Sequence, residues 1–277
     1  MINYGLFVPR WLSGQPETHV EDSLPEIGIA LSGGGVRAIA HLGVLQALEE
    51  YGLKPGIVSG VSGGAIVGAL YADGYKPEEI ARLFQEYKFL QLAKVAVPRK
   101  GLIGSSRLYR ILGGLLRAKT FEELKIPLVV NATDFSEGKP AYFSSGPLLK
   151  VIIASSSIPV LMNPVEMNGK QYVDGCIFCN LPAKVIRGRC RKLIGVHVEP
   201  VAPVKPLNSI IEIAERAYNL TIQSNTLEEK QVCDLVIEPR EAREFGLFDT
   251  SKSAQLFEIG YRAGKEALEK QGESLLK

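Results

Sequence analysis

The sequence predicts a three-layer α/β/α fold, in which helices cover both faces of a mostly parallel central sheet. Short apolar runs alternate with helical patterns along most of the chain, which is the order expected of parallel strands joined by helices. Glycine-rich turns follow the first two apolar runs, at residues 33–35 and 60–64. The chain has 277 residues, of which 46% are hydrophobic and 22% charged, so it can bury one large core.

Glycine and proline divide the first part of the chain. Apolar residues at helical spacing follow the first glycine turn, and Gly52 and Pro55 end that helix. Residues 1–26 have no regular pattern, and we expect an N-terminal arm that packs on the domain. The expected elements are a strand at 27–31, a helix at 36–51, a strand at 57–60, a helix at 63–72 and an amphipathic helix at 77–93.

The second part continues the alternation and adds one hairpin. Residues 136–140 are typical of a turn, so residues 141–143 should return as an antiparallel strand. No repeat or low-complexity linker divides residues 27–277, so we expect one domain there. The other expected elements are strands at 126–134, 193–200 and 234–238 and helices at 148–157, 207–231 and 251–271.

Charge and cysteine content argue against several classes of protein. The net charge is +2, from 32 basic and 30 acidic residues, which does not suit a nucleic-acid binder. Cys176 and Cys179 form a C-x-x-C pair without a second ligand pair, so we expect free thiols of a reducing compartment and no zinc. Neither a signal-peptide pattern nor an apolar run of about 18 residues is visible. We therefore expect a cytoplasmic protein without a membrane-spanning helix.

The second strand runs into Gly60-Val61-Ser62-Gly63-Gly64, a G-x-S-x-G sequence. A sharp strand-to-helix turn of this kind presents its serine hydroxyl at the carboxyl edge of the sheet, where the helix N-terminus favours developing negative charge. We interpret Ser62 as a nucleophile, against the simpler reading that it only caps a helix.

The turn at Gly33, Gly34 and Gly35 ends the neighbouring strand, so its backbone N–H groups should lie on the same edge as Ser62. Two interpretations exist. The turn could bind an oxyanion, or it could hold a dinucleotide, because Gly33, Gly35 and Ala38 match G-x-G-x-x-A. A dinucleotide site needs an acid about 20 residues further on, at the end of the next strand, and the serine occupies that place. We favour the oxyanion hole and expect no cofactor.

Several segments together resemble the patatin-like phospholipase family. They are SGGGVRAIAHLGVLQAL, GVSGG, NATDFSEGKPAYFSSG, ASSSIPVLMNPVEMNG and YVDG, within residues 27–200. The resemblance, which is to small stand-alone bacterial members, implies a patatin-like fold and a serine–aspartate dyad without metal. It makes Ser62 the nucleophile, Asp174 the base and the glycine turn the oxyanion hole. The chain departs from the family at Cys176, where the residue after Asp174-Gly175 is usually glycine or alanine.

Other polar residues near these segments have simpler interpretations. His197 follows Asp174 and would complete a triad, but it lies in an expected strand; His41 lies inside an expected helix. We expect structural roles for both. Arg37 either binds a lipid phosphate or carboxylate or steadies the glycine turn, and we favour the second role. Asp134 should cap a turn, and Ser155, Ser156 and Ser157 should end a helix.

The sequence therefore predicts a lipid acyl hydrolase that cleaves carboxylic esters of phospholipids, lysophospholipids or glycerides through an acyl-serine. An acyltransferase with the same intermediate and a non-catalytic lipid-binding module are the alternatives. Basic and apolar residues alternate over residues 83–117, which suits either a flap that docks on the inner face of an anionic membrane or ordinary core helices.

Overall fold

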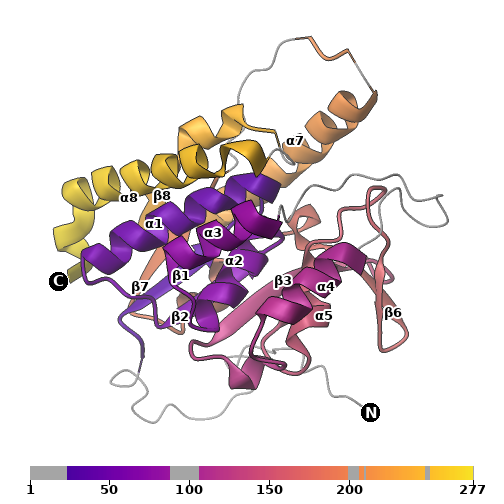
Figure 1. Cartoon of the computed structure of the whole chain (residues 1–277), viewed down its shortest axis with the longest axis horizontal. Coiled ribbons are helices and arrows are strands. Elements are labelled where there is room, and N and C mark those ends of the chain that lie inside the picture. Colours follow the sequence, from indigo (N-terminus) through magenta and orange to yellow (C-terminus); the bar gives the residue numbers. More distant parts are fainter. Residues whose placement is uncertain (1–23, 88–105, 199–205, 209, 247–249, 277) are drawn as a thin grey trace.

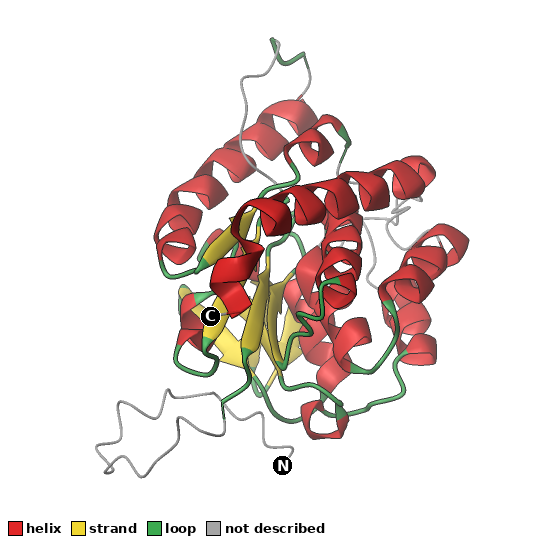
Figure 2. Cartoon of the chain, turned by 90° about the vertical axis from the view of Figure 1, so that its left-hand side faces the viewer, coloured by secondary structure: helices red, strands yellow, loops and turns green. Residues whose placement is uncertain are grey.

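The computed structural model describes five parts of the chain, and the fold consists of these parts. A sheet of eight strands lies between helices on its two faces (Figures 1 and 2), which confirms the predicted layers. The described parts are residues 24–87, 106–198, 206–208, 210–246 and 250–276.

One half of the sheet is parallel and apolar, as expected of strands that are buried on both faces. Its pairs join β3 to β2, β2 to β1, β1 to β7 and β7 to β8. The strands are β1 (Ile27–Leu31), β2 (Ile57–Val61), β3 (Leu128–Asp134), β7 (Lys192–Val196) and β8 (Leu235–Ile237).

The other half of the sheet is antiparallel, so the sheet is mixed. Here β3 pairs with β4 (Lys139–Phe143), the predicted hairpin strand, and with β6 (Lys170–Asp174). β6 pairs in turn with β5 (Val165–Met167). The pair β5–β6 was not expected from the sequence.

Helices on one face of the sheet bury the larger core. Alternate strand residues such as Ile29 and Leu31 point into it, whereas Ala30 points to the other face. The helices of this core are α1 (Ile39–Glu50), α2 (Gly63–Ala72), α3 (Pro77–Tyr87), α4 (Ser106–Leu115), α5 (Leu148–Ser155) and α8 (Ser253–Leu276). The opposite face carries α6 (Lys184–Arg187) and α7 (Ile210–Gln231).

Helix α8 packs directly against α1 because glycines let the two backbones meet. A Cβ on Gly43 would collide with the carbonyl oxygen of Phe257, and a Cβ on Gly260 with that of Ala40. Helix α1 therefore lies between the sheet and α8 and is buried almost throughout.

Most predicted elements are present, with shifted ends. The helix expected at 36–51 starts as a 3₁₀ turn, η3 (Gly35–Ala38), and continues as α1. The helix at 63–72 has the predicted bounds. Residues 1–23 and 88–105 lie outside the described parts, so the arm and the centre of the 83–117 segment stay predictions.

Candidate active site

Ser62 lies in a strained turn between β2 and α2. Its φ of 53° and ψ of −123° fall in a region that residues with a side chain rarely adopt. Glycine is required two residues before and two residues after Ser62, because neighbouring backbone atoms leave no room for a side chain. A Cβ on Gly60 would lie 2.6 Å from the carbonyl oxygen of Gly64, and one on Gly64 would collide with the carbonyl oxygens of Leu31 and Ser32. The G-x-S-x-G sequence thus forms the predicted elbow.

The register of β3 brings Asp174 to Ser62. Residue Asn131 pairs with both β2 and β4, and the residues after it pair with both β4 and β6. Since a strand residue has one partner on each side, β2 and β6 lie along the same edge of β3 and run toward each other. Strand β2 ends at Val61, opposite Asn131, and β6 ends at Asp174, opposite Ala132. Ser62 Oγ donates to Asp174 Oδ2 at 2.7 Å.

The carboxylate of Asp174 is buried and held by further donors. Its Oδ1 accepts from the backbone N–H of Cys176 at 2.9 Å. Thr133 Oγ1 donates to the backbone carbonyl oxygen of Asp174 at 2.9 Å. Burial raises the pKa of Asp174, while hydrogen bonds from Ser62 and Cys176 act in the opposite direction. The raised pKa makes this carboxylate a stronger base than an exposed aspartate.

The glycine turn lies against the serine. A Cβ on Gly33 would lie 3.3 Å from Cβ of Ser62 and would collide with the Cys176 thiol. The N–H of Gly33 donates to Asn180, to the carbonyl oxygen at 3.2 Å and to Oδ1 at 3.1 Å. Gly34 and Gly35 have φ of 146° and 56°, which favour glycine.

The role of the glycine turn as an oxyanion hole stays a prediction. The N–H of Gly33 donates to Asn180. Within the described chain, no hydrogen bond engages the N–H of Gly34 or of Gly35. Gly33 instead allows the turn to pack closely against Cys176 and Ser62.

Two serines that the sequence predicted only to end a helix also support the elbow. Ser155 Oγ accepts from the N–H of Ser62 at 2.9 Å and donates to the carbonyl oxygen of Asn131 at 2.6 Å. Ser156 Oγ reaches the carbonyl oxygen of Ser62 at 3.3 Å. These serines lie at the end of α5 as predicted. Through them the end of α5 also holds the backbone of Ser62 next to β3.

Arg37 and Asp134 have structural contacts. Arg37 is buried, and its Nε donates to the carbonyl oxygen of Phe245 at 2.7 Å, which ties η3 to the chain before α8. This contact favours the loop-supporting role. Asp134 caps the turn after β3 as predicted, since its Oδ1 accepts from the N–H groups of Ser136 and Glu137 at 3.1 and 3.0 Å.

Both buried histidines have hydrogen-bond partners other than Ser62. His197 directly follows β7, and its Nδ1 lies 3.3 Å from Glu238 Oε1. His41 Nε2 lies 2.8 Å from the carbonyl oxygen of Ser32. Burial lowers the pKa of both, that of His41 to about 4. In the described residues, Ser62 Oγ makes no hydrogen bond to either ring.

The thiols and carboxylates suggest no second centre. None of the four cysteines is in a disulfide bond, and within the described ranges no three His, Cys, Asp or Glu side chains are grouped to hold a metal ion. None of the helices in those ranges combines the length and apolarity needed to cross a bilayer.

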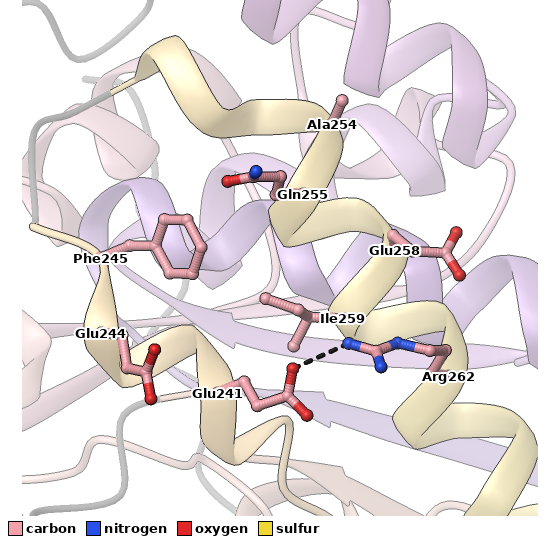
Figure 3. Close-up of a pocket in the computed structure, with 8 residues that line it drawn as sticks. All are labelled: Glu241, Glu244, Phe245, Ala254, Gln255, Glu258, Ile259 and Arg262. Carbon is pink, nitrogen blue, oxygen red and sulfur yellow. Dashed lines mark hydrogen bonds and ion pairs between the residues drawn. The ribbon is translucent and has the colours of Figure 1, made fainter.

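An open hollow of about 500 Å³ lies between α8 and the 3₁₀ turn η6 (Arg240–Glu244) (Figure 3). Arg262 forms an ion pair with Glu241 across it. None of the predicted site residues lines this hollow, although Arg37 reaches the backbone of Phe245 at its border. The hollow holds carboxylates without a nucleophile, so the serine elbow remains the candidate site.

Fold and site together define an α/β protein with a serine elbow at the carboxyl edge of its sheet and a carboxylate hydrogen-bonded to that serine. The chain belongs to the patatin-like phospholipase family, whose sequence pattern it matches over residues 29–186, more than half its length. The match spans both β2 with its elbow and β6 with Asp174.

Named relatives agree with this assignment. An uncharacterized NTE family protein of Mycobacterium tuberculosis is 34% identical over 168 residues, which is 60% of this chain and 47% of the relative. Lysophospholipase NTE1 of Saccharomyces cerevisiae is 31% identical over 200 residues, which is 70% of this chain and 11% of the yeast protein. The chain thus spans at most about half the length of these relatives.

A solved structure shares the fold. VipD from Legionella pneumophila superimposes with a TM-score of 0.53 and 14% sequence identity, over 89% of this chain and 67% of VipD. At that identity the likeness concerns the fold alone.

Proposed function

We propose that this chain is a lipid acyl hydrolase with a serine–aspartate dyad. The observation that carries the proposal is the direct hydrogen bond of 2.7 Å from Ser62 Oγ to Asp174 Oδ2 inside a strained elbow. A nucleophile and its base must lie within about 2.6–3.2 Å, and this pair does so without an intervening imidazole. Membership of a phospholipase family supports a lipid ester as substrate.

In the proposed reaction, Ser62 Oγ attacks the ester carbonyl carbon while Asp174 takes its proton. The protonated Asp174 then donates to the departing alkoxide, which leaves an acyl-serine. Water attacks the acyl group, again giving its proton to Asp174, and the fatty acid leaves as the proton returns to Ser62 Oγ. The raised pKa of Asp174 suits a group that must accept and return a proton.

The oxyanion would be bound by backbone N–H groups of the glycine turn. Gly34 and Gly35 supply donors, while Gly33 holds the turn against Asn180. Gly63, the first residue of α2, lies beside them, because a Cβ there would be 3.4 Å from the nitrogen of Gly35. Its N–H follows the nucleophile, which is the usual place of an oxyanion donor in an elbow.

Two alternatives remain from the sequence. An acyltransferase would use the same acyl-serine and pass it to an alcohol instead of water. A non-catalytic lipid-binding module is disfavoured by the intact Ser62–Asp174 bond. We further propose that the protein acts in the cytoplasm, at the surface of a membrane.

The test is covalent labelling of Ser62 by a fluorophosphonate, followed by release of fatty acid from lysophosphatidylcholine. Ser62→Ala should abolish labelling, and Asp174→Asn should slow it by orders of magnitude while thermal unfolding changes little. Asn keeps the size of Asp but cannot accept the proton. Glu166→Gln, at an exposed site on β5, is the matched control and should keep full labelling. Labelling of another serine would refute the assignment.

A further inference from the structure

Helix α7 exposes large apolar side chains that an ordinary surface helix would bury. Its exposed apolar residues Ile213, Leu220 and Leu227 recur every seven residues, with 54%, 48% and 58% of their surfaces exposed. Ala217 and Ser224, also exposed, fall on the same face. We call these five residues the α7 stripe. A surface helix normally points such residues into the core.

In the part of α7 from residue 220 onward, where every side chain is described, two of the three buried residues are polar. Ile222, Thr226 and Glu229 are buried, and at 100° per residue they lie opposite the α7 stripe. Glu229 accepts from the N–H groups of Ala183 and Lys184 at 3.0 and 2.7 Å. This part of the helix therefore uses polar side chains for much of its contact with the protein.

Contacts with the candidate active site fix this orientation. Asn225 Nδ2 donates to the carbonyl oxygens of Cys176 and Ile177 at 3.2 and 3.1 Å, just after the base Asp174. Asn225 Oδ1 accepts from the N–H of Asn180 at 3.0 Å. Ile222 packs with Val61 and Cys176 beside the elbow. Rotating the helix to bury its leucines would break these bonds, so the α7 stripe stays exposed. Helix α7 itself lies at the edge of the molecule (Figure 1).

The segment first expected to dock on membranes behaves differently where it is described. Phe84 on α3 and Leu108 and Leu112 on α4 are buried in the main core. Their apolar side chains are not available to a lipid surface. In the described chain, the α7 stripe is the helix face where large apolar side chains gather on the outside.

The size and charge of the α7 stripe favour a lipid surface over a second copy of the chain. From Ile213 to Leu227 it is about 21 Å long and one helix wide, too little for the roughly 800 Å² per partner of a stable dimer. Near it, Lys184 pairs with Glu228 and Lys230 with Glu238, and among the described α7 side chains Arg216 is the one cation without an ion pair to a described residue. The α7 stripe therefore offers little of a basic rim for anionic lipid.

We propose that the α7 stripe inserts into the surface of a zwitterionic bilayer and so anchors the helix that packs beside the Ser62–Asp174 site to the lipid. This inference rests on the proposed lipid hydrolase function and adds where the substrate surface is met. Because insertion is apolar, added salt should leave binding unchanged.

The experiment measures co-sedimentation with phosphatidylcholine vesicles, in a Ser62→Ala background that prevents hydrolysis. The double change Leu220→Asp and Leu227→Asp should lower the partition coefficient by about tenfold or more, because a charge replaces each inserted side chain. The double change to Ile should bind like the parent. Phe135→Asp, which removes an exposed apolar side chain elsewhere, is the matched control and should also bind normally.

Outcomes separate this inference from the proposed function. In the chain with Ser62 intact, the double Asp variant should keep fluorophosphonate labelling and hydrolysis of a dissolved short-chain ester, and lose hydrolysis of vesicle lipid. Absence of Ser62 labelling in the parent would remove the proposed function, while vesicle binding could still be scored. Equal vesicle binding by parent and double Asp variant would overturn the inference. So would binding that requires anionic lipid and low salt, or a parent dimer that the double Asp variant dissociates.

Discussion

His41 should make the stability of this protein depend on pH. The ring is fully buried inside α1, and its Nε2 is bonded to the carbonyl oxygen of Ser32, next to the glycine turn. Among the described residues its Nδ1 has no hydrogen-bond partner, and the nearby His197 adds repulsion for the charged form. Burial is the largest cause of its lowered pKa. The perturbation that isolates it is His41→Gln, whose amide nitrogen can still donate to Ser32.

The magnitude follows from proton linkage. The folded pKa of His41 is about 4 and the ordinary value is 6.5. Between these values the unfolded chain binds more protons than the native one, so stability falls as the pH falls. Each pKa unit corresponds to about 1.36 kcal/mol, which gives about 3 kcal/mol for the full effect and about 2.5 kcal/mol by pH 4.5. The contribution is fully present above pH 6.5 and lost toward pH 4.

Urea unfolding at about pH 7.5 and about pH 4.5 measures this effect. Carboxylates and His197 also titrate, but they do so in parent and variant alike, so the difference between the two proteins reports His41. The free energy of unfolding of His41→Gln should fall by about 2.5 kcal/mol less than that of the parent. If both lose the same stability, His41 is not buried in its neutral form. Fluorophosphonate labelling at about pH 7.5 should be retained.

Two further changes test the supports of the site. Ser155→Ala removes the acceptor for the N–H of the strained Ser62, so it should lower the free energy of unfolding in urea by about 1–3 kcal/mol and slow fluorophosphonate labelling. Ser156→Ala should lower it less, because Ser156 Oγ lies 3.3 Å from the carbonyl oxygen of Ser62. Arg37→Met removes the bond to the carbonyl oxygen of Phe245 and should lower the unfolding free energy by about 1–2 kcal/mol; unchanged stability with a raised KM for an anionic lipid would instead indicate that Arg37 binds substrate.

The parallel half of the sheet could be predicted because its strands are apolar runs bounded by glycine. The hairpin β5–β6, which carries Asp174, was not predicted, since Val165–Met167 and Lys170–Asp174 mix polar and apolar residues. A local signal was present. Asn168 and Gly169 both have positive φ, of 51° and 75°, and Asn-Gly is the strongest sequence signal of a tight hairpin turn.

Within the candidate site, the serine elbow was recognisable from the sequence and its supports were not. Gly60 and Gly64 mark the elbow because backbone contact leaves no room for a side chain. The serines after α5 and Asn180 come from distant parts of the chain, and only the folded register brings them to Ser62 and Gly33. Residue type and local spacing hold no information about such contacts.

The position of His197 argues against a hidden triad. Serine, aspartate and histidine follow one another in an order that suits a triad enzyme. However, β7 is separated from β2 by β1, so the ends of those strands stand about 10 Å apart. His197 is bonded to Glu238, which also pairs with Lys230 at 2.6 Å, and it would have to leave that network to approach Ser62. Asp174 Oδ2 already occupies the place beside Ser62 Oγ where an imidazole would have to stand.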